Sequence, residues 1–241
     1  MAETLFVSDL HLDEDRPQII RGFRHFLEDR APEAEALYIL GDLFEYWIGD
    51  DDPASPFEPV MASLRDLGQR IPVYFLAGNR DFLAGSGFAE RSGCQLLDEP
   101  VALDLYGTPT LLMHGDTLCT DDRDYLALRA RLRDPGWQER FLARPLSERR
   151  QEARALRAES HRAQVAKATA ITDVNPEAVA ATFRQHGVDR LIHGHTHRPA
   201  IHRGDVDGRP VERVVLGDWY TQGSLLECTP AGCRLTPWGC R

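Results

Sequence analysis

Several histidine and carboxylate residues stand in short groups whose spacing suits metal binding. His195 and His197 lie two residues apart, directly after Gly194. In an extended segment or a tight loop, side chains at positions i and i+2 project in the same direction, so both imidazoles can reach one cavity. A single pair of this kind is more often structural or solvated than metal-binding. Its meaning depends on whether the rest of the chain repeats the pattern.

The pattern recurs four times, and each time the group follows a short apolar run. The groups contain Asp9 and His11, then Asp42, Asn79 and His114. The runs before them and before His195 are typical of buried strands: residues 4–8, 36–40, 72–76, 109–113 and 190–193. The sequence therefore places every group at the carboxyl end of a predicted strand.

Segments with helical periodicity separate these strands. Pro17 opens one of them, and its apolar residues fall on one face: Ile19, Ile20, Phe23, Phe26 and Leu27. Residues 57–69 form a second, and a third begins at Asn175 and Pro176 and ends near Gly187. Further strands are predicted at residues 212–216, 224–228 and 233–236. Strands that alternate with helices indicate an α/β fold, in which ligands bind at the carboxyl ends of strands.

The candidate residues combine two carboxylates, one amide oxygen and four imidazoles. They are Asp9, His11, Asp42, Asn79, His114, His195 and His197. This set is too large for a closed structural zinc site and suits two adjacent ions with mixed nitrogen and oxygen ligands. We expect Asp42 to bridge the ions, because it follows a glycine that permits close approach. Ions held about 3.5–4 Å apart can hold an attacking hydroxide and a phosphorus for in-line displacement.

Composition restricts the kinds of partner. The chain has 241 residues and a formal net charge of -10, which argues against generic binding to nucleic acid or anionic membranes. We see no secretory signal and no apolar run long enough to span a membrane. The five cysteines are odd in number and lack zinc-type spacing, so we expect reduced thiols in a cytoplasmic protein.

Residues 121–170 contain no strand signal and are predicted to form a helical cap inserted in a single domain, residues 1–241. Residues 123–167 carry twelve basic and six acidic side chains, which leaves sixteen basic and thirty-two acidic residues elsewhere. The cap therefore has a net charge of +6 inside an acidic chain. A solvated helical surface with many ion pairs is the simplest interpretation. Because no candidate ligand lies in the cap, we expect it to bind substrate rather than to take part in the chemistry.

The cap also has a stripe of large apolar residues. Trp137, Phe141, Leu142 and Leu146 alternate with arginines. Such a stripe usually packs against a core, but it could also accept acyl chains or lie at a bilayer surface. Four polar positions accompany it: Asp122, Ser160, Gln164 and Lys167. The last three share a helix face, and Lys167 is the only lysine, which reflects either compositional bias or a specific task for an ammonium group.

Taken together, the five groups resemble the motifs of the calcineurin-like metallophosphoesterases, in that family's order, from residue 9 to residue 197. The resemblance implies two packed β-sheets flanked by helices, a four-layer αββα sandwich. It also implies one ion held by Asp9, His11, Asp42 and His197. It assigns a second ion to Asp42, Asn79, His114 and His195. The alternative is that these seven polar residues serve only turns and helix caps.

Arg80 narrows the predicted chemistry. Many members of this family have a histidine after the asparagine, where it can protonate a leaving alkoxide. Arginine cannot act as an acid, because its pKa exceeds about 12. A phosphate ester leaves as a stabilised anion, since its second pKa is about 6. We therefore expect Arg80 to clamp phosphate oxygens beside a P–O–P bond.

Within the superfamily, the chain is similar to the pyrophosphohydrolases of lipid A biosynthesis in Gram-negative bacteria. The similarity lies in the groups already described, in residues 41–50 and in the cap. It implies hydrolysis of UDP-2,3-diacylglucosamine to UMP and lipid X, with two Mn²⁺ ions and a metal-bound hydroxide attacking the α-phosphorus. The substrate contacts it implies are Asn79, Arg80, Asp122, Ser160, Gln164, Lys167 and His195. It implies a peripheral location on the cytoplasmic face of the inner membrane, without nucleic acid or an obligate protein partner.

Two other functions stay open at this point. A phosphodiesterase of the same superfamily could act on another nucleotide or phosphodiester, but it would favour histidine in place of Arg80 or a less amphipathic cap. A non-catalytic scaffold on the same fold typically loses metal ligands, whereas all seven candidate positions are present here. A structural metal protein is disfavoured by the mixed ligand set.

Overall fold

Two β-sheets pack face to face in the computed structural model, which describes residues 2–53, 56–166 and 173–239. In these ranges, the first sheet has the order β11-β10-β1-β2-β3-β4 and the second β5-β6-β7-β9-β8. The first contains β1 (Thr4–Val7), β2 (Ala36–Leu40), β3 (Val73–Leu76), β4 (Gln95–Leu97), β10 (Gly223–Thr229) and β11 (Gly232–Trp238). The second contains β5 (Val101–Leu105), β6 (Thr108–Leu112), β7 (Arg190–His193), β8 (Ala200–Val206) and β9 (Arg209–Val215).

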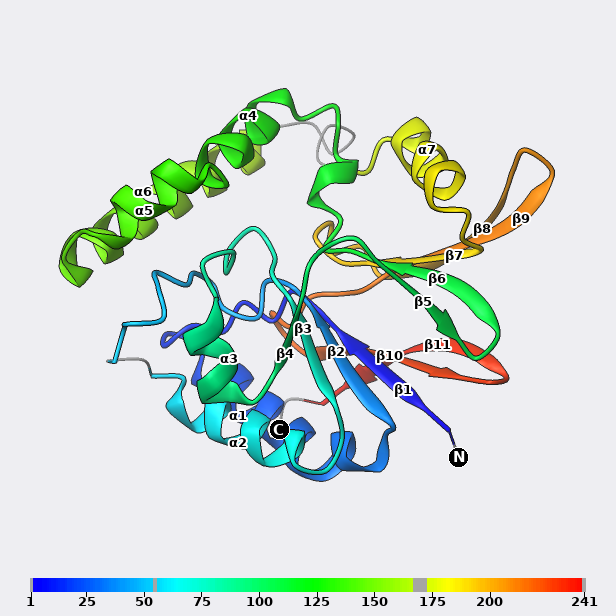
Figure 1. Ribbon diagram of the computed structural model, residues 1–241, viewed down its shortest axis with the longest axis horizontal. Helices are drawn as coiled ribbons and strands as arrows, with labels where there is room; N and C mark the ends of the chain where they lie inside the picture. Colours follow the sequence, from blue (N-terminus) through cyan, green and yellow to red (C-terminus); the bar gives the residue numbers. More distant parts are fainter. Residues whose placement is uncertain (1, 54–55, 167–172, 240–241) are drawn as a thin grey trace.

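Helices cover the outer face of each sheet (Figure 1). The first sheet is covered by α1 (Pro17–His25), α2 (Glu58–Gly68) and α3 (Ser86–Ser92). A π-helical turn, Phe26–Arg30, and a 3₁₀ turn, Ala31–Glu33, extend α1. The second sheet is covered by α7 (Pro176–His186), which Asn175 caps and Gly187 ends in a left-handed conformation, as predicted. The four layers confirm the predicted αββα sandwich.

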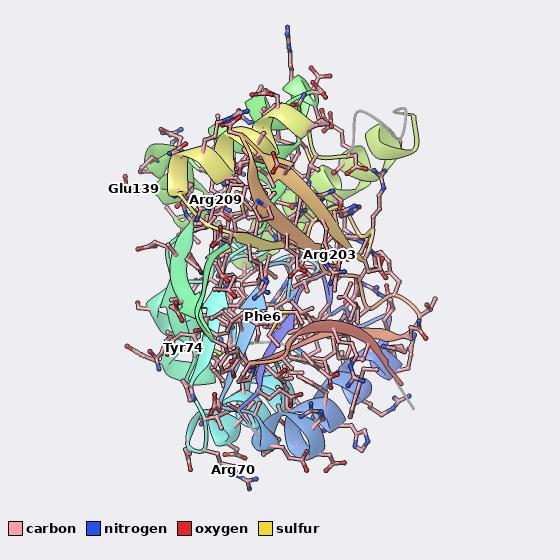
Figure 2. All side chains as sticks on the ribbon, turned by 90° about the vertical axis from the view of Figure 1, so that its right-hand side faces the viewer. Phe6, Arg70, Tyr74, Glu139, Arg203 and Arg209 are labelled. Atoms are coloured by element: carbon pink, nitrogen blue, oxygen red, sulfur yellow. A yellow bond between two sulfur atoms is a disulfide. The ribbon has the colours of Figure 1, made fainter. Side chains whose placement is uncertain are left out.

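The layers are held together by three groups of buried apolar side chains. The middle group lies between the sheets and includes Phe6, Leu112 and Ile192, none of which is exposed. Figure 2 shows Phe6 in the interior between the two sheets. The other groups seal α1 and α2 against the first sheet and α7 against the second. Burial on both faces explains why the strands β1, β2, β3 and β7 read as continuous apolar runs.

Among the described residues, three α-helices lie between β6 and α7 and form the cap: α4 (Arg123–Leu132), α5 (Pro135–Leu142) and α6 (Leu146–Ala166). Figure 1 shows them apart from the sheets, above the loops that follow β2 and β3. Asp122 and Asp134 cap α4 and α5 by accepting the backbone N–H groups of Tyr125 and Trp137. Pro135 opens α5 rather than interrupting it, since proline tolerates the first helical turn. Within the described ranges, none of the helices has the length and apolar character needed to cross a membrane.

Several elements were not predicted. The helix α3 and the strands β4, β5 and β8 lie in stretches that gave no clear periodicity. All three strands occupy sheet edges or have largely exposed side chains, so their residues need not be apolar.

The expectation of reduced thiols is wrong for one pair of cysteines. Cys228 on β10 and Cys233 on β11 face each other in register across a hairpin and form a disulfide. The five-residue separation gave no sign of this pairing, which depends on the strand register. Cys94 and Cys119 are buried thiols, and burial raises the pKa of each to about 12.

Candidate metal centre

The five predicted groups converge at one edge between the two sheets. The strands β1, β2 and β3 run parallel in the first sheet, and β6 and β7 run parallel in the second. Each of these strands ends two or three residues before a candidate ligand. The predicted position at strand carboxyl ends is therefore confirmed.

Three side chains form a first cluster: Asp9, His11 and His197. The Nε2 atoms of His11 and His197 are 3.2 Å apart. Asp9 Oδ1 lies 3.4 Å from His197 Nε2 and 4.0 Å from His11 Nε2. The three donor atoms lie close enough together to hold one ion.

A second cluster centres on the amide oxygen of Asn79. Asn79 Oδ1 is 2.9 Å from His114 Nε2 and 2.9 Å from His195 Nδ1. These three atoms also converge on one point. They belong to the nitrogen and oxygen donors that the family resemblance implies for a second ion.

Asp42 lies between the two clusters. Its Oδ2 atom is 3.8 Å from His11 Nε2, and its Oδ1 atom is 3.7 Å from His114 Nε2. One carboxylate oxygen therefore faces each cluster. Asp9, Asp42 and His114 also meet the geometric requirement for holding one ion.

The backbone is strained at five of the seven candidate ligands. Their φ angles are positive: Asp9 54°, His11 48°, Asp42 53°, His195 67° and His197 55°. Such angles are uncommon for residues with a Cβ atom, and a strained backbone gathers at functional sites. In the described ranges, the other non-glycine residues with positive φ are Tyr106 and Asp207, and each precedes a glycine in a tight turn.

Glycines allow the loops to approach one another. Gly41 has a φ of 87°, and a Cβ atom there would lie 2.6 Å from the backbone of Gly78 and from His114 Nδ1. A Cβ atom at Gly194 would collide with the Asp9 carboxylate and the Ser8 hydroxyl. A side chain at these positions would push the ligand loops apart.

Hydrogen bonds from outside the clusters orient the ligands. His114 Nδ1 lies 2.9 Å from the Leu40 carbonyl oxygen, which leaves Nε2 to face the clusters. The fully buried Asp81 carboxylate accepts the backbone N–H groups of Leu43 (2.7 Å) and Gly78 (2.8 Å), so it joins the loops that carry Asp42 and Asn79.

The carboxylates make the centre attractive to cations. Burial disfavours charge on His114, but the carboxylates of Asp42 and Asp9 outweigh it and raise the imidazole pKa to about 9. Burial also opposes charge on His197, but Asp9 and Asp218 raise its pKa to about 10. Burial raises the pKa of Asp42 to about 7. Without a metal, protons supply the positive charge that these carboxylates require, and a divalent cation can replace them.

The predicted substrate contacts lie beside the centre. Asn79, Arg80, Asp122, Ser160 and His195 all line one large cavity that also contains ligands of both clusters. Arg80 Nε is buried and has no hydrogen-bond partner among the described residues. Asp122 also caps α4. The side chain of Gln164 and all of Lys167 lie outside the part of the chain that the structure describes.

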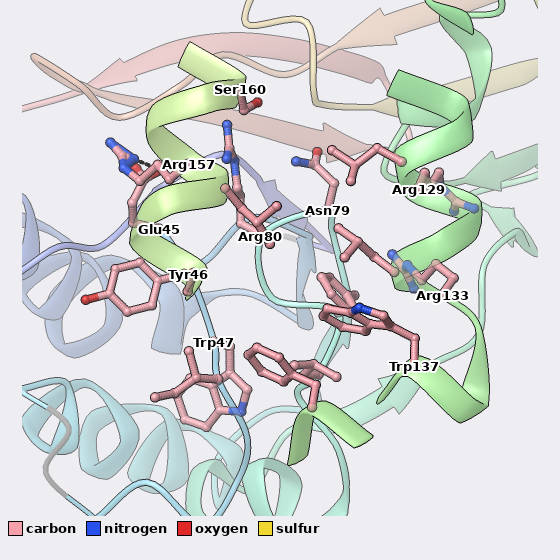
Figure 3. A pocket seen from close by; sticks show the side chains of 18 of the residues that line it. Glu45, Tyr46, Trp47, Asn79, Arg80, Arg129, Arg133, Trp137, Arg157 and Ser160 are labelled. Carbon is pink, nitrogen blue, oxygen red and sulfur yellow. Dashed lines mark ion pairs between the residues drawn. The ribbon is translucent and has the colours of Figure 1, made fainter. Parts of the chain in front are cut away.

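A second, largely apolar cavity opens next to the first. Its wall comes from the cap and from the loops after β2 and β3: Trp47, Phe82, Leu83, Leu128, Leu132, Trp137, Phe141 and Leu156. Figure 3 shows Trp47 and Trp137 below Asn79 and Arg80, which line both cavities. In the predicted apolar stripe, Trp137 and Phe141 line this cavity, whereas Leu142 is exposed.

Three buried carboxylates beside the ligands were not given a role by the sequence. Glu45, Asp81 and Asp116 are each at most 2% exposed. Each stands two or three residues after a candidate ligand, and this position was the signal in the sequence that could have found it. Their roles depend on partners from distant segments, which spacing does not reveal.

The αββα fold and the mixed donor set at its strand ends are those of a metal-dependent phosphoesterase. The fold agrees with a solved archaeal phosphodiesterase, which covers 98% of this chain and 99% of its own with a TM-score of 0.51. That protein is 13% identical in sequence, so the likeness concerns the fold alone.

Sequence comparisons identify the family. The model of the calcineurin-like phosphoesterases matches residues 3–199. The chain is 52% identical to the UDP-2,3-diacylglucosamine hydrolase of Xanthomonas campestris pv. campestris, over 96% of this chain and 97% of that protein. It is 51% identical to the protein of the same name in Edwardsiella ictaluri, over 96% and 90%. The chain therefore belongs to the calcineurin-like phosphoesterases, within the family of these hydrolases, and is a metal-dependent hydrolase.

Proposed function

We propose that this protein hydrolyses the pyrophosphate bond of UDP-2,3-diacylglucosamine and releases UMP and lipid X, a step of lipid A biosynthesis. The observation that carries the proposal is the junction of the two cavities at Asn79 and Arg80. A polar cavity with the candidate metal ligands meets an apolar cavity there. A substrate with a pyrophosphate between a nucleoside and two acyl chains matches this arrangement, and the names of the similar proteins support it.

The residues fit two divalent ions, and we propose Mn²⁺ for both. Asp9, His11, Asp42 and His197 would hold one, and Asp42, Asn79, His114 and His195 the other. When bound, such ions polarise a phosphoryl oxygen and lower the pKa of water. The mixed nitrogen and oxygen donors and the shared Asp42 suit a pair of manganese ions better than a closed zinc site.

Arg80 binds the phosphate oxygens next to these ligands. Its buried Nε atom lacks a partner among the described residues, so a phosphate oxygen can accept its hydrogen bond. Its guanidinium stays protonated throughout the reaction and stabilises the departing phosphate by charge. A water oxygen forms a bond to the α-phosphorus while the bond from that phosphorus to the bridging oxygen breaks. UMP keeps the water oxygen, the proton passes to solvent, and lipid X leaves as a phosphate anion that needs no acid.

The apolar cavity receives the acyl chains. Trp47, Phe82 and Trp137 provide aromatic surface for methylene groups, each of which contributes about 0.8 kcal/mol when buried. A substrate of this kind resides in a bilayer, so we propose a peripheral position at the cytoplasmic face of the inner membrane. The basic cap is the surface suited to face anionic head groups.

The test is UMP release from UDP-2,3-diacylglucosamine by the purified protein. We expect turnover with Mn²⁺, loss of turnover after chelation, and recovery when Mn²⁺ is restored. UDP-N-acetylglucosamine, which lacks the two long acyl chains, is the matched control and should be a poor substrate. Equal turnover of both compounds would contradict the acyl-chain assignment, and absence of UMP in every condition would contradict the proposed function.

A further inference from the structure

Arginines of the cap reach the carboxylates that support the candidate metal ligands. On α4, Arg129 Nε donates to Asp116 Oδ2 at 2.6 Å, and Arg129 Nη2 donates to Glu99 Oε1 at 3.0 Å. The hydroxyl of Tyr125, also on α4, donates to the same Asp116 oxygen at 2.6 Å. One guanidinium therefore joins two carboxylates through the fork geometry that lysine cannot reproduce.

Both carboxylates act on the segment that carries His114. Glu99 Oε2 accepts the backbone N–H of His114 at 2.8 Å. Asp116 is fully buried two residues after His114. Arg129 consequently fixes Glu99 and Asp116 on either side of the histidine. Glu99 holds the backbone of His114 directly, whereas Asp116 ties the same segment to α4 two residues further on.

Arg133, the residue that caps the carboxyl end of α4, reaches the loop of Asn79. Arg133 Nη2 donates to the Gly78 carbonyl oxygen at 2.9 Å, and its guanidinium lies 5.2 Å from the centre of the Phe82 ring. Gly78 is the residue directly before Asn79. Arg129 and Arg133 thus contact the supports of His114 and Asn79, and the Nε2 atom of His114 lies 2.9 Å from the Oδ1 atom of Asn79.

The other cluster has a similar connection from α6. Arg157 forms an ion pair with Glu45, a carboxylate that is 2% exposed (Figure 3). Glu45 Oε2 lies 3.5 Å from His11 Nδ1, which is buried and has no hydrogen-bond partner among the described residues. His11 Nε2 can bind a metal when the ring proton is on Nδ1. Glu45 is the acidic group nearest to that Nδ1–H.

We propose that Arg129, Arg133 and Arg157 are positioning residues of the metal centre. This inference depends on the metal ligands assigned in the proposed function. The three arginines also line the apolar cavity, together with Glu45. In this proposal the cap supports the metal ligands as well as the acyl chains, whereas the sequence led us to expect a role in substrate binding alone.

The test uses Arg129→Gln in the full-length chain and measures the Mn²⁺ dissociation constant by competition with a chelating indicator. We expect metal affinity to fall about tenfold, as is typical when a supporting partner is removed. We also expect kcat for bis(p-nitrophenyl) phosphate, which has no acyl chain, to fall about tenfold with little change in KM. Arg129→Lys keeps the charge but loses the fork, so it should recover only part of the loss.

The matched control is Arg144→Gln. Arg144 is a cap arginine that pairs with Glu152, another cap residue, and both are partly exposed. This variant should bind Mn²⁺ like the wild type. If Arg129→Gln fails to fold, Glu99→Gln tests the same connection from the core side and should weaken metal binding similarly.

The proposal is overturned if folded Arg129→Gln or Glu99→Gln has wild-type metal affinity and wild-type kcat on the small ester. Loss of lipid hydrolysis alone would then mean that the arginines contact only substrate. A wild-type protein that binds no Mn²⁺ would instead contradict the metal assignment. Wild-type metal binding without hydrolysis of UDP-2,3-diacylglucosamine would contradict the proposed substrate and leave the positioning test valid.

Discussion

The backbone N–H of His195 lies between both carboxylate oxygens of Asp9, at 3.1 Å from Oδ1 and 3.0 Å from Oδ2. The two residues are 186 positions apart and follow strands of different sheets. This contact joins the first and last groups of candidate ligands. It holds Asp9 in place by a hydrogen bond that does not depend on a metal, so part of the centre is organised before any ion binds.

Gly194→Ala should disrupt this contact. The new methyl group would collide with the Asp9 carboxylate and the Ser8 hydroxyl, so the loop must move away from Asp9. We expect Mn²⁺ affinity and turnover to fall at least about tenfold. Gly204→Ala is the control, since a Cβ atom there meets no described atom within 4 Å. Equal metal affinity in the two variants would contradict the role assigned to Gly194.

Asp42→Ala and His197→Ala should differ in metal content. Asp42 faces both clusters, whereas His197 belongs to one. We expect Asp42→Ala to retain little of either ion and His197→Ala to retain about one per chain. Mass analysis of the metal in the purified, folded proteins provides the measurement. Wild-type occupancy in Asp42→Ala would exclude a bridging role.

Arg80→Ala should lower kcat/KM for UDP-2,3-diacylglucosamine by about 10- to 150-fold, which corresponds to about 1.5–3 kcal/mol for a hydrogen bond to a charged group. Arg80→His should not restore this activity, because imidazole lacks the planar fork. It should improve hydrolysis of an alkyl phosphodiester, whose poor leaving group benefits from an acid. The phosphate-clamp interpretation is wrong if Arg80→His hydrolyses the pyrophosphate as well as the wild type.

Trp137→Ala should impair the lipid substrate selectively. Trp137 lines the apolar cavity and stacks on Phe141 at a centroid distance of 4.9 Å. Losing contact with two or three methylenes should raise KM about 15- to 60-fold, at about 0.8 kcal/mol each. Turnover of bis(p-nitrophenyl) phosphate should change little. Leu142→Ala removes an exposed cap residue outside the cavity and should affect neither substrate.

Metal binding should release protons. The pKa values of about 9 for His114 and about 10 for His197 mean that both imidazoles are protonated at pH 7.5 in the metal-free protein. A ligating imidazole must be neutral, so binding should release up to about two protons and affinity should rise with pH up to these values. Calorimetry in HEPES and in Tris measures the release. Identical enthalpies in the two buffers would show that no proton is released.

The candidate ligands could be predicted because local rules determine them. The apolar runs before Asp9, Asp42, Asn79, His114 and His195 predicted buried strands, and parallel strands bring their carboxyl ends to one edge. The disulfide of Cys228 could not be predicted in this way. It depends on the register of β10 and β11, which is a property of the paired strands.

The sequence by itself determined the alternation of strands and helices, the seven candidate ligands and the presence of a basic, amphipathic helical segment. These follow from periodicity and from residues near one another in the chain, whereas the αββα sandwich was implied by the resemblance to the calcineurin-like family. Only the tertiary structure decided which distant residues support the ligands. One example is Arg129, which reaches the carboxylates of Glu99 and Asp116 beside His114. It also decided that Trp137 lines a cavity while Leu142 is exposed. The physical reason is that such contacts depend on how the cap packs against the loops, and spacing along the chain carries no information about that packing.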